Sequence, residues 1–107
     1  MDERLVERHA ASVAEDGYTV LEGAIEPALV AELRDETRRL ERALDVRPLN
    51  TLAEGNATLR MYNLLAKSSL FRRMPTHPGV LPLVDRLVPG SLLSGMTAID
   101  IGPGERG

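Results

Sequence analysis

Apolar residues recur at three- and four-residue spacing in two stretches of the chain, and this spacing predicts two amphipathic helices. The first helix ends at Asp16 and is followed by Gly17, which suits the position after a last helical turn. The second covers residues 25–44, with Pro27 near its start, where the missing N–H costs no intrahelical hydrogen bond. We expect this helix to pack on a core, because its apolar stripe spans too few heptads for a coiled coil. The stripe comprises Leu29, Val30, Leu33, Thr37, Leu40 and Leu44.

A run rich in β-branched and aromatic residues predicts a strand over residues 18–23, and alternation of side chains between two faces predicts strands over residues 58–65 and 91–101. In the second run, alternation places Leu59, Met61 and Leu65 on one face and Arg60 and Tyr62 on the other. In the third run, the odd-numbered positions are expected to face the core, and they are Leu93, Thr97, Ile99 and Ile101. The even-numbered face is mixed and suits either solvent or a polar cavity; it comprises Leu92, Ser94, Met96, Ala98 and Asp100.

Between these elements the pattern changes. Residues 45–57 contain Pro, Asn and Gly without periodicity, which predicts a loop long enough to form the rim of a site. A short helical turn is predicted over residues 67–74, and a helix over residues 77–90 with Pro78 near its start. We expect one domain, residues 1–107, and no second domain.

Composition and charge narrow the classes of protein. The 107 residues carry a formal net charge of −3, with acidic and basic residues interleaved, which argues against a nucleic-acid partner. There is no cysteine, so disulfides and thiolate metal sites are excluded. The first ten residues lack the apolar core of a secretory signal, and no apolar run approaches the ~20 residues that cross a bilayer. We therefore expect a cytoplasmic protein with no membrane partner.

Few residues indicate catalysis by this chain alone. Neither of the two histidines, His9 and His77, lies near a carboxylate at a ligand-like spacing on a shared predicted strand. His9 falls on the apolar stripe of the first helix, which favours packing, and His77 precedes Pro78, which favours a cap or rim position. No serine stands in a Gly-X-Ser-X-Gly elbow, and "GPGERG" lacks the Lys-Ser or Lys-Thr pair of a phosphate loop. We predict neither a metal site nor a nucleophile from these residues.

Arg60 is the candidate binding residue. It lies in a predicted strand on the face opposite the apolar residues, in register with Tyr62. A guanidinium on a strand that faces a cavity can hold a carboxylate through two parallel hydrogen bonds. The alternative is an arginine that faces solvent on a half-exposed strand, since charged side chains are mostly exposed.

The order of the motifs resembles one family. "EDGYTVLEGAIEPALVAELRDETRRL" resembles the opening of the phytanoyl-CoA dioxygenase family, and "LRMYNLLAKSSLFRRMPTHPGVLPLVDRLVPG" resembles its middle segment. "SLLSGMTAIDIGPGERG" is similar to the strand and Pro-Gly turn that come next, so the resemblance covers the chain from about Ala14 onward. It implies an α+β chain that forms the N-terminal helices and first strands of a double-stranded β-helix, a jelly-roll barrel that is incomplete here.

The resemblance also implies an activity. Such enzymes use Fe(II), 2-oxoglutarate and O₂, commonly to hydroxylate a small molecule, and hold the iron by a His-X-Asp pair and a distant His. The pair comes a few residues beyond the Pro-Gly turn, here Pro103-Gly104, so we expect the metal ligands to lie outside these 107 residues. The isolated chain is then expected to be inactive, to bind no cofactor tightly, and to self-associate through unpaired strand edges. The alternative is a non-catalytic, stand-alone helical interaction module derived from the same scaffold.

Four residues match positions that contact the co-substrate in this family. The basic residue in the strand ahead of the Leu-Phe turn falls on Arg60. The strand before the Pro-Gly turn places Met96, Ala98 and Asp100 along the co-substrate pocket. Asp100 departs from what an anionic co-substrate would prefer nearby.

Overall fold

The computed structural model describes residues 1–53 and 55–105. Helix α1 (Glu3–Asp16) begins at Asp2, whose carboxylate accepts the N–H of Leu5 at 2.8 Å. It ends at Gly17, which adopts a left-handed φ of 82° and donates its N–H to the carbonyl of Val13. Both helix ends are therefore set by local residues, and the end at Gly17 is the one that the sequence predicts.

A first small core lies between α1 and α4 (Leu81–Leu87). It consists of Val6, Ala10 and Leu83, with Met1 and Leu21 packed at its edge. Across its surface the guanidinium of Arg86 donates to both carboxylate oxygens of Glu7, at 2.6 and 3.2 Å. The N-terminal helix is thus held by a segment almost eighty residues away.

A second core forms beneath α2 (Pro27–Ala43), where four buried side chains meet: Leu40, Met61, Leu64 and Phe71. They come from α2, strand β1 (Leu59–Met61), helix α3 (Leu64–Lys67) and the 3-10 turn η1 (Ser69–Arg73). Of the predicted stripe on α2, Leu29 and Leu40 are buried, whereas Val30 and Leu44 are half exposed.

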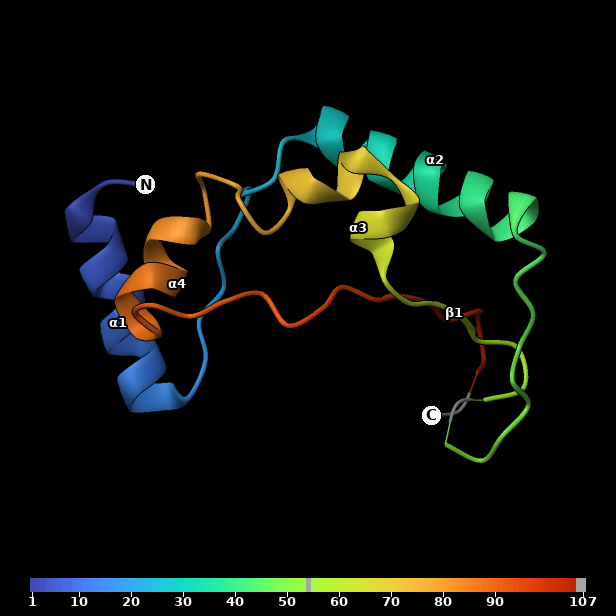
Figure 1. The fold of residues 1–107 in the computed structure, drawn as a ribbon. Helices are drawn as coiled ribbons and strands as arrows, with labels where there is room; N and C mark the ends of the chain where they lie inside the picture. Colours follow the sequence, from blue (N-terminus) through green and yellow to red (C-terminus); the bar gives the residue numbers. More distant parts are fainter. Residues whose placement is uncertain (54, 106–107) are drawn as a thin grey trace.

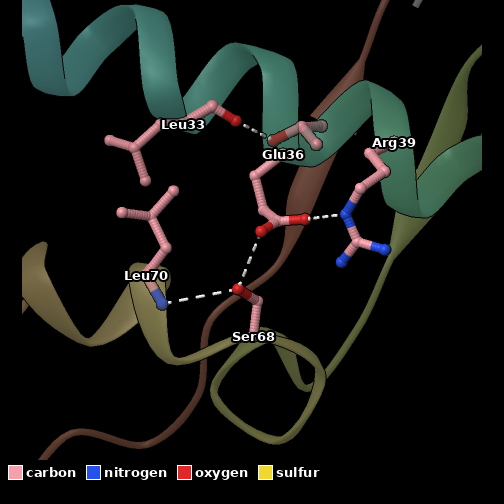
Figure 2. A network of polar contacts seen from close by, with 6 residues as sticks. Leu33, Glu36, Arg39, Ser68 and Leu70 are labelled. Carbon is pink, nitrogen blue, oxygen red and sulfur yellow. Dashed lines mark hydrogen bonds and ion pairs between the residues drawn. The ribbon is translucent and has the colours of Figure 1, made fainter.

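Side-chain hydrogen bonds connect α2 to η1 (Figure 2). Ser68 donates to Glu36 at 3.2 Å and accepts the N–H of Leu70 at 3.4 Å, which caps the start of η1. The other oxygen of Glu36 accepts a hydrogen bond from Arg39, one turn along α2. The turn that carries Phe71 is thereby held against the helix that Phe71 packs on.

Strand β1 pairs with β2 (Ala98–Asp100) in an antiparallel ladder of three residue pairs. The pairs are Leu59 with Asp100, Arg60 with Ile99, and Met61 with Ala98. Residues directly opposite each other in such a ladder point to the same face. Met61 and Ala98 face α2, and Arg60 and Ile99 occupy the other face.

The molecule is elongated rather than spherical (Figure 1). The α1–α4 pair lies at one end and α2, α3 and the strands at the other, and residues 88–97 run between them. The Cα radius of gyration is 16.2 Å, whereas a compact domain of about 100 residues has about 13 Å. Two small cores therefore replace the single core of an ordinary domain of this size.

Of the three predicted strands, one is absent among the described residues and two are shorter than predicted. Residues 18–23 form no strand in the described part of the chain, and Tyr18 and Val20 are exposed there. Strand 91–101 is reduced to Ala98–Asp100, and strand 58–65 ends at Met61 because Asn63 adopts a left-handed φ of 55° before α3. A β-branched run becomes a strand only where a neighbour pairs with it. The helix predicted over residues 77–90 is also shorter, at Leu81–Leu87.

The predicted core face of the last strand was also wrong. Ile99 and Ile101 are 50% and 63% exposed, and Leu93 is 51% exposed. Met96 and Ala98, from the even-numbered face, pack on the core under α2 instead. The reason is tertiary: the ladder turns the Met61–Ala98 pair toward the core under α2 and leaves the more apolar odd-numbered face half exposed.

His77 is buried rather than at a rim, with 6% of its surface exposed. Its Nδ1 accepts the N–H of Gly79 at 3.0 Å, and its Nε2 lies 2.9 Å from the carboxylate of Glu26, the residue before α2. Because one nitrogen accepts, the other carries the proton and donates to Glu26. This hydrogen bond lowers the pKa of Glu26. The pair fixes the start of α2 to the segment that leads into α4.

The Glu7–Arg86 pair predicts a pH dependence of stability. The hydrogen bond from Arg86 lowers the pKa of Glu7 below its ordinary value of 4.5. A lowered folded-state pKa gives stability that is present above the unfolded value and is lost as pH falls through the folded one. We expect urea midpoints of the wild type to exceed those of Glu7→Gln well above pH 4.5 and to converge with them well below it. Glu22→Gln, an exposed change outside the helices, is the control and should show no such convergence.

Candidate functional site

The candidate site centres on Arg60, in the middle of β1. Its partner across the ladder is Ile99, so both side chains lie on the face away from α2. Arg60 is half-buried, and Tyr62, at the end of the same strand, is half exposed. The arginine thus lies at the border between the second core and an uncovered sheet face.

The guanidinium of Arg60 has an unused donor. Its Nε atom is buried and has no hydrogen-bond partner in the described part of the structure. An unsatisfied buried donor costs about 1–3 kcal/mol, and more when the group is charged. A buried donor of this kind is satisfied by a water, an ion or a ligand with an oxygen acceptor, and the acceptor that suits a guanidinium best is a carboxylate.

The other three candidate residues do not meet Arg60. Met96 and Ala98 pack against the core under α2, and the carbonyl of Met96 accepts the N–H of Leu64 at 3.2 Å. Asp100 pairs with Leu59, on the same face as Ala98 and opposite to Arg60. The structure therefore divides the predicted set of four, with Arg60 on one face of the ladder and Ala98 and Asp100 on the other.

Asp100 belongs to a pair of carboxyl groups with Glu41 of α2. Burial raises the pKa of Glu41, and its hydrogen bond with Asp100 raises it further, while Arg38 and Arg42 oppose the shift. This effect places Asp100 of β2 beside Glu41 of α2. An open groove of about 450 Å³ runs beside this pair and is lined by Arg34, Thr37, Arg38, Ile99, Asp100 and Ile101.

The described residues do not fit an iron site. Nowhere in residues 1–53 and 55–105 do three or more His, Cys, Asp or Glu side chains converge as metal ligands. Both histidines are used elsewhere: His77 pairs with Glu26, and the Nδ1 of His9 lies 2.7 Å from the hydroxyl of Thr19. His9 is half-buried on α1, as its place in the stripe predicts. None of the described helices is long and apolar enough to span a membrane.

Sequence reasoning missed one contact near the strand ends. The carboxylate of Glu105 accepts the backbone N–H groups of Asn56 and Ala57, at 2.6 and 3.0 Å. The residues are separated by almost fifty positions, so no local pattern joins them. The sequence offered one indirect signal. Pro103 has no N–H group and cannot continue the hydrogen bonding between strands, so backbone groups opposite it need other partners.

Comparison with protein families decides the relationship. The family model for phytanoyl-CoA dioxygenase matches residues 13–100, which is most of the 107-residue chain. The chain belongs to the phytanoyl-CoA dioxygenase family. The match begins within α1, ends with β2 and includes Arg60. No solved structure matches the chain significantly.

Membership confirms the resemblance that the motifs indicated. Enzymes of the phytanoyl-CoA dioxygenase family are generally Fe(II)- and 2-oxoglutarate-dependent oxygenases, and the family implies a cupin-like fold. The observed mixture of helices with a small antiparallel sheet is compatible with the predicted α+β class. The family's small-molecule substrates agree with the predicted class of partner.

Proposed function

We propose that these residues form the N-terminal part of an Fe(II)/2-oxoglutarate-dependent dioxygenase that hydroxylates a small molecule. The iron-holding side chains are supplied by residues other than those described here. The family match supports the reaction class.

The main support for this proposal is the large accessible surface area of the chain. Its accessible surface is 7834 Å². A folded monomeric protein of 11.7 kDa is expected to expose only about 5,900 Å². The excess includes apolar side chains along residues 92–101, such as Leu92 at 93% exposure and Ile101 at 63%. Further strands of a jelly-roll barrel, paired beside β2, would cover this surface.

The geometry supports a role for Arg60 in this enzyme. Helices pack on the outside of the family's barrel, and α2 covers the Met61–Ala98 face of the ladder. The opposite face, with Arg60 and Ile99, is then the barrel interior. We assign Arg60 to one carboxylate of 2-oxoglutarate, because its buried Nε lacks an acceptor among the described residues. Met96 and Ala98 support the strand from its covered side, and Asp100 turns to Glu41.

No chemical step is assigned to the described residues, because they do not fit an iron site. Iron together with 2-oxoglutarate and O₂ supplies the oxidising chemistry in enzymes of this class. The part of this chain is to bind and orient the co-substrate carboxylate within the barrel. A fixed charged group that orients a reactant lowers the barrier of the reaction substantially.

The proposal is tested by comparing the 107-residue chain with a longer polypeptide from the same gene. With added Fe(II) and 2-oxoglutarate, we expect succinate formation from the longer protein and none from the short chain. Sedimentation should show the short chain associating, because its strand edge and apolar face are open. Turnover by the short chain alone contradicts the proposal. An inactive longer protein favours the non-catalytic interaction module instead.

A further inference from the structure

Glu105 makes a contact that the proposed function does not use. Its Oε1 atom accepts two backbone N–H groups, from Asn56 at 2.6 Å and from Ala57 at 3.0 Å. These amides lie two and three residues before β1, whereas Glu105 follows the turn after β2. The contact therefore joins the two strands at one end of the ladder, beyond the Leu59–Asp100 pair.

The carboxylate takes the place of a strand carbonyl. The ladder ends at the pair Leu59–Asp100, and Pro103 has no N–H with which to continue it. The chain instead turns, with the N–H of Glu105 donating to the carbonyl of Gly102 at 3.3 Å. The turn brings the Glu105 side chain back over the amides that precede β1. A carboxylate that accepts backbone N–H groups makes charge-assisted bonds, which are stronger than neutral ones.

Gly55 has no side chain, and the Glu105 carboxylate occupies the space that a side chain would fill. A Cβ at this position would lie 2.1 Å from the Glu105 Oε1, and the φ of Gly55 is +77°, a backbone conformation that favours glycine. Any larger residue would displace the carboxylate from its two donors. The contact thus depends on a specific residue at each end.

The ladder that this contact closes is short, with three residue pairs. Shifting a strand by one residue moves each of its side chains to the opposite face, and short ladders specify their register weakly. A slip of β1 would turn Arg60 toward the core under α2 and Met61 toward the open face. A contact that fixes the strand ends therefore decides which face Arg60 occupies.

We propose that Glu105 is a positioning residue that locks the register of β1 against β2 and so holds Arg60 on the face away from α2. Only the use of Arg60 for a co-substrate rests on the proposed function. The lock itself is a property of the 107-residue chain and needs neither iron nor 2-oxoglutarate.

The test uses NMR of the 107-residue chain. In Glu105→Ala, exchange of the Asn56 and Ala57 amides should become about tenfold faster or more, because a charge-assisted acceptor is lost. The cross-strand nuclear Overhauser contacts between Arg60 and Ile99 should weaken or shift by one residue. Glu105→Gln keeps an oxygen acceptor and should retain the register and most of the protection. Glu22→Ala is the control for loss of an exposed carboxylate and should leave both signals unchanged.

Gly55→Ala is an independent test of the same contact, because it displaces the carboxylate while Glu105 is still present. We expect it to reproduce the signals of Glu105→Ala. The proposal is overturned if the two amides exchange at the wild-type rate in Glu105→Ala, or if the Arg60–Ile99 contacts persist unchanged in both variants. If Glu105→Gln loses the strand register as fully as Glu105→Ala does, an oxygen acceptor at this position is not what fixes the register. These readouts stand even if no dioxygenase activity is found in any longer protein.

Discussion

Phe71→Ala is expected to remove most of the stability of this chain. Phe71 is 3% exposed and packs with Leu40, Met61 and Leu64 in the core under α2. Truncation of a buried phenylalanine costs about 3–5 kcal/mol, against a total of about 5–15 kcal/mol for a typical domain. The melting temperature, followed by circular dichroism, should fall by about 15 °C or more.

The matched control is Leu92→Ala, which truncates a side chain that is 93% exposed in the segment before β2. We expect the melting temperature of this variant to stay within a few degrees of the wild type, because its side chain is already in water. Equal shifts for the two variants would contradict the assignment of the second core. They would mean that Phe71 is not a shared contact of α2, β1 and α3.

Arg60→Met should have opposite effects on stability and on function. In the 107-residue chain it removes a charged group whose Nε is buried without an acceptor, and the unbranched apolar side chain of methionine reaches as far as the Nε position. We expect the free energy of unfolding to rise by about 1–2 kcal/mol. In the longer protein, the affinity for 2-oxoglutarate should fall roughly 30-fold or more, because loss of one partner of a buried charge pair costs about 2–5 kcal/mol.

Two measurements check this prediction, namely urea denaturation of the short chain and calorimetric titration of the longer protein with 2-oxoglutarate. Arg4→Met is the control, since Arg4 lies exposed on α1 and makes no ion pair within the described residues. Its stability and affinity should match the wild type. A destabilised Arg60→Met chain would show that the guanidinium is satisfied in the folded state. Unchanged affinity would remove Arg60 from the co-substrate site.

The two N-terminal helices were readable from the sequence because their signals are local, whereas the helix predicted over residues 77–90 was too long. Gly17 ends α1 by adopting a left-handed backbone, and Pro27 opens α2 where it needs no N–H donor. The ordered motifs from Ala14 onward carried the relationship to the phytanoyl-CoA dioxygenase family, which the match over residues 13–100 confirms. Arg60 could be placed on the face opposite Met61 by alternation alone, and the ladder confirms that placement.

The faces of the ladder could not be read in this way. Alternation separates two faces but does not say which of them a helix will cover, and the more apolar face of residues 91–101 is the exposed one. Strand length likewise depends on a partner: the apolar run before Ala98 finds none among the described residues and forms no ladder there. The contacts between Glu41 and Asp100 and between Glu105 and Asn56 join positions roughly fifty or more residues apart.

By itself, then, the amino-acid sequence determined α1 and α2, with the end of α1 at Gly17 and the start of α2 at Pro27, because these depend on neighbours within one or two turns of the chain. The order of the motifs along the chain determined the family. Only the tertiary structure decided which sheet face is core and where Arg60 lies relative to Met96, Ala98 and Asp100. Burial is settled by what packs on a surface, and for this ladder the packing partner is α2, whose position no alternation pattern in the strands encodes.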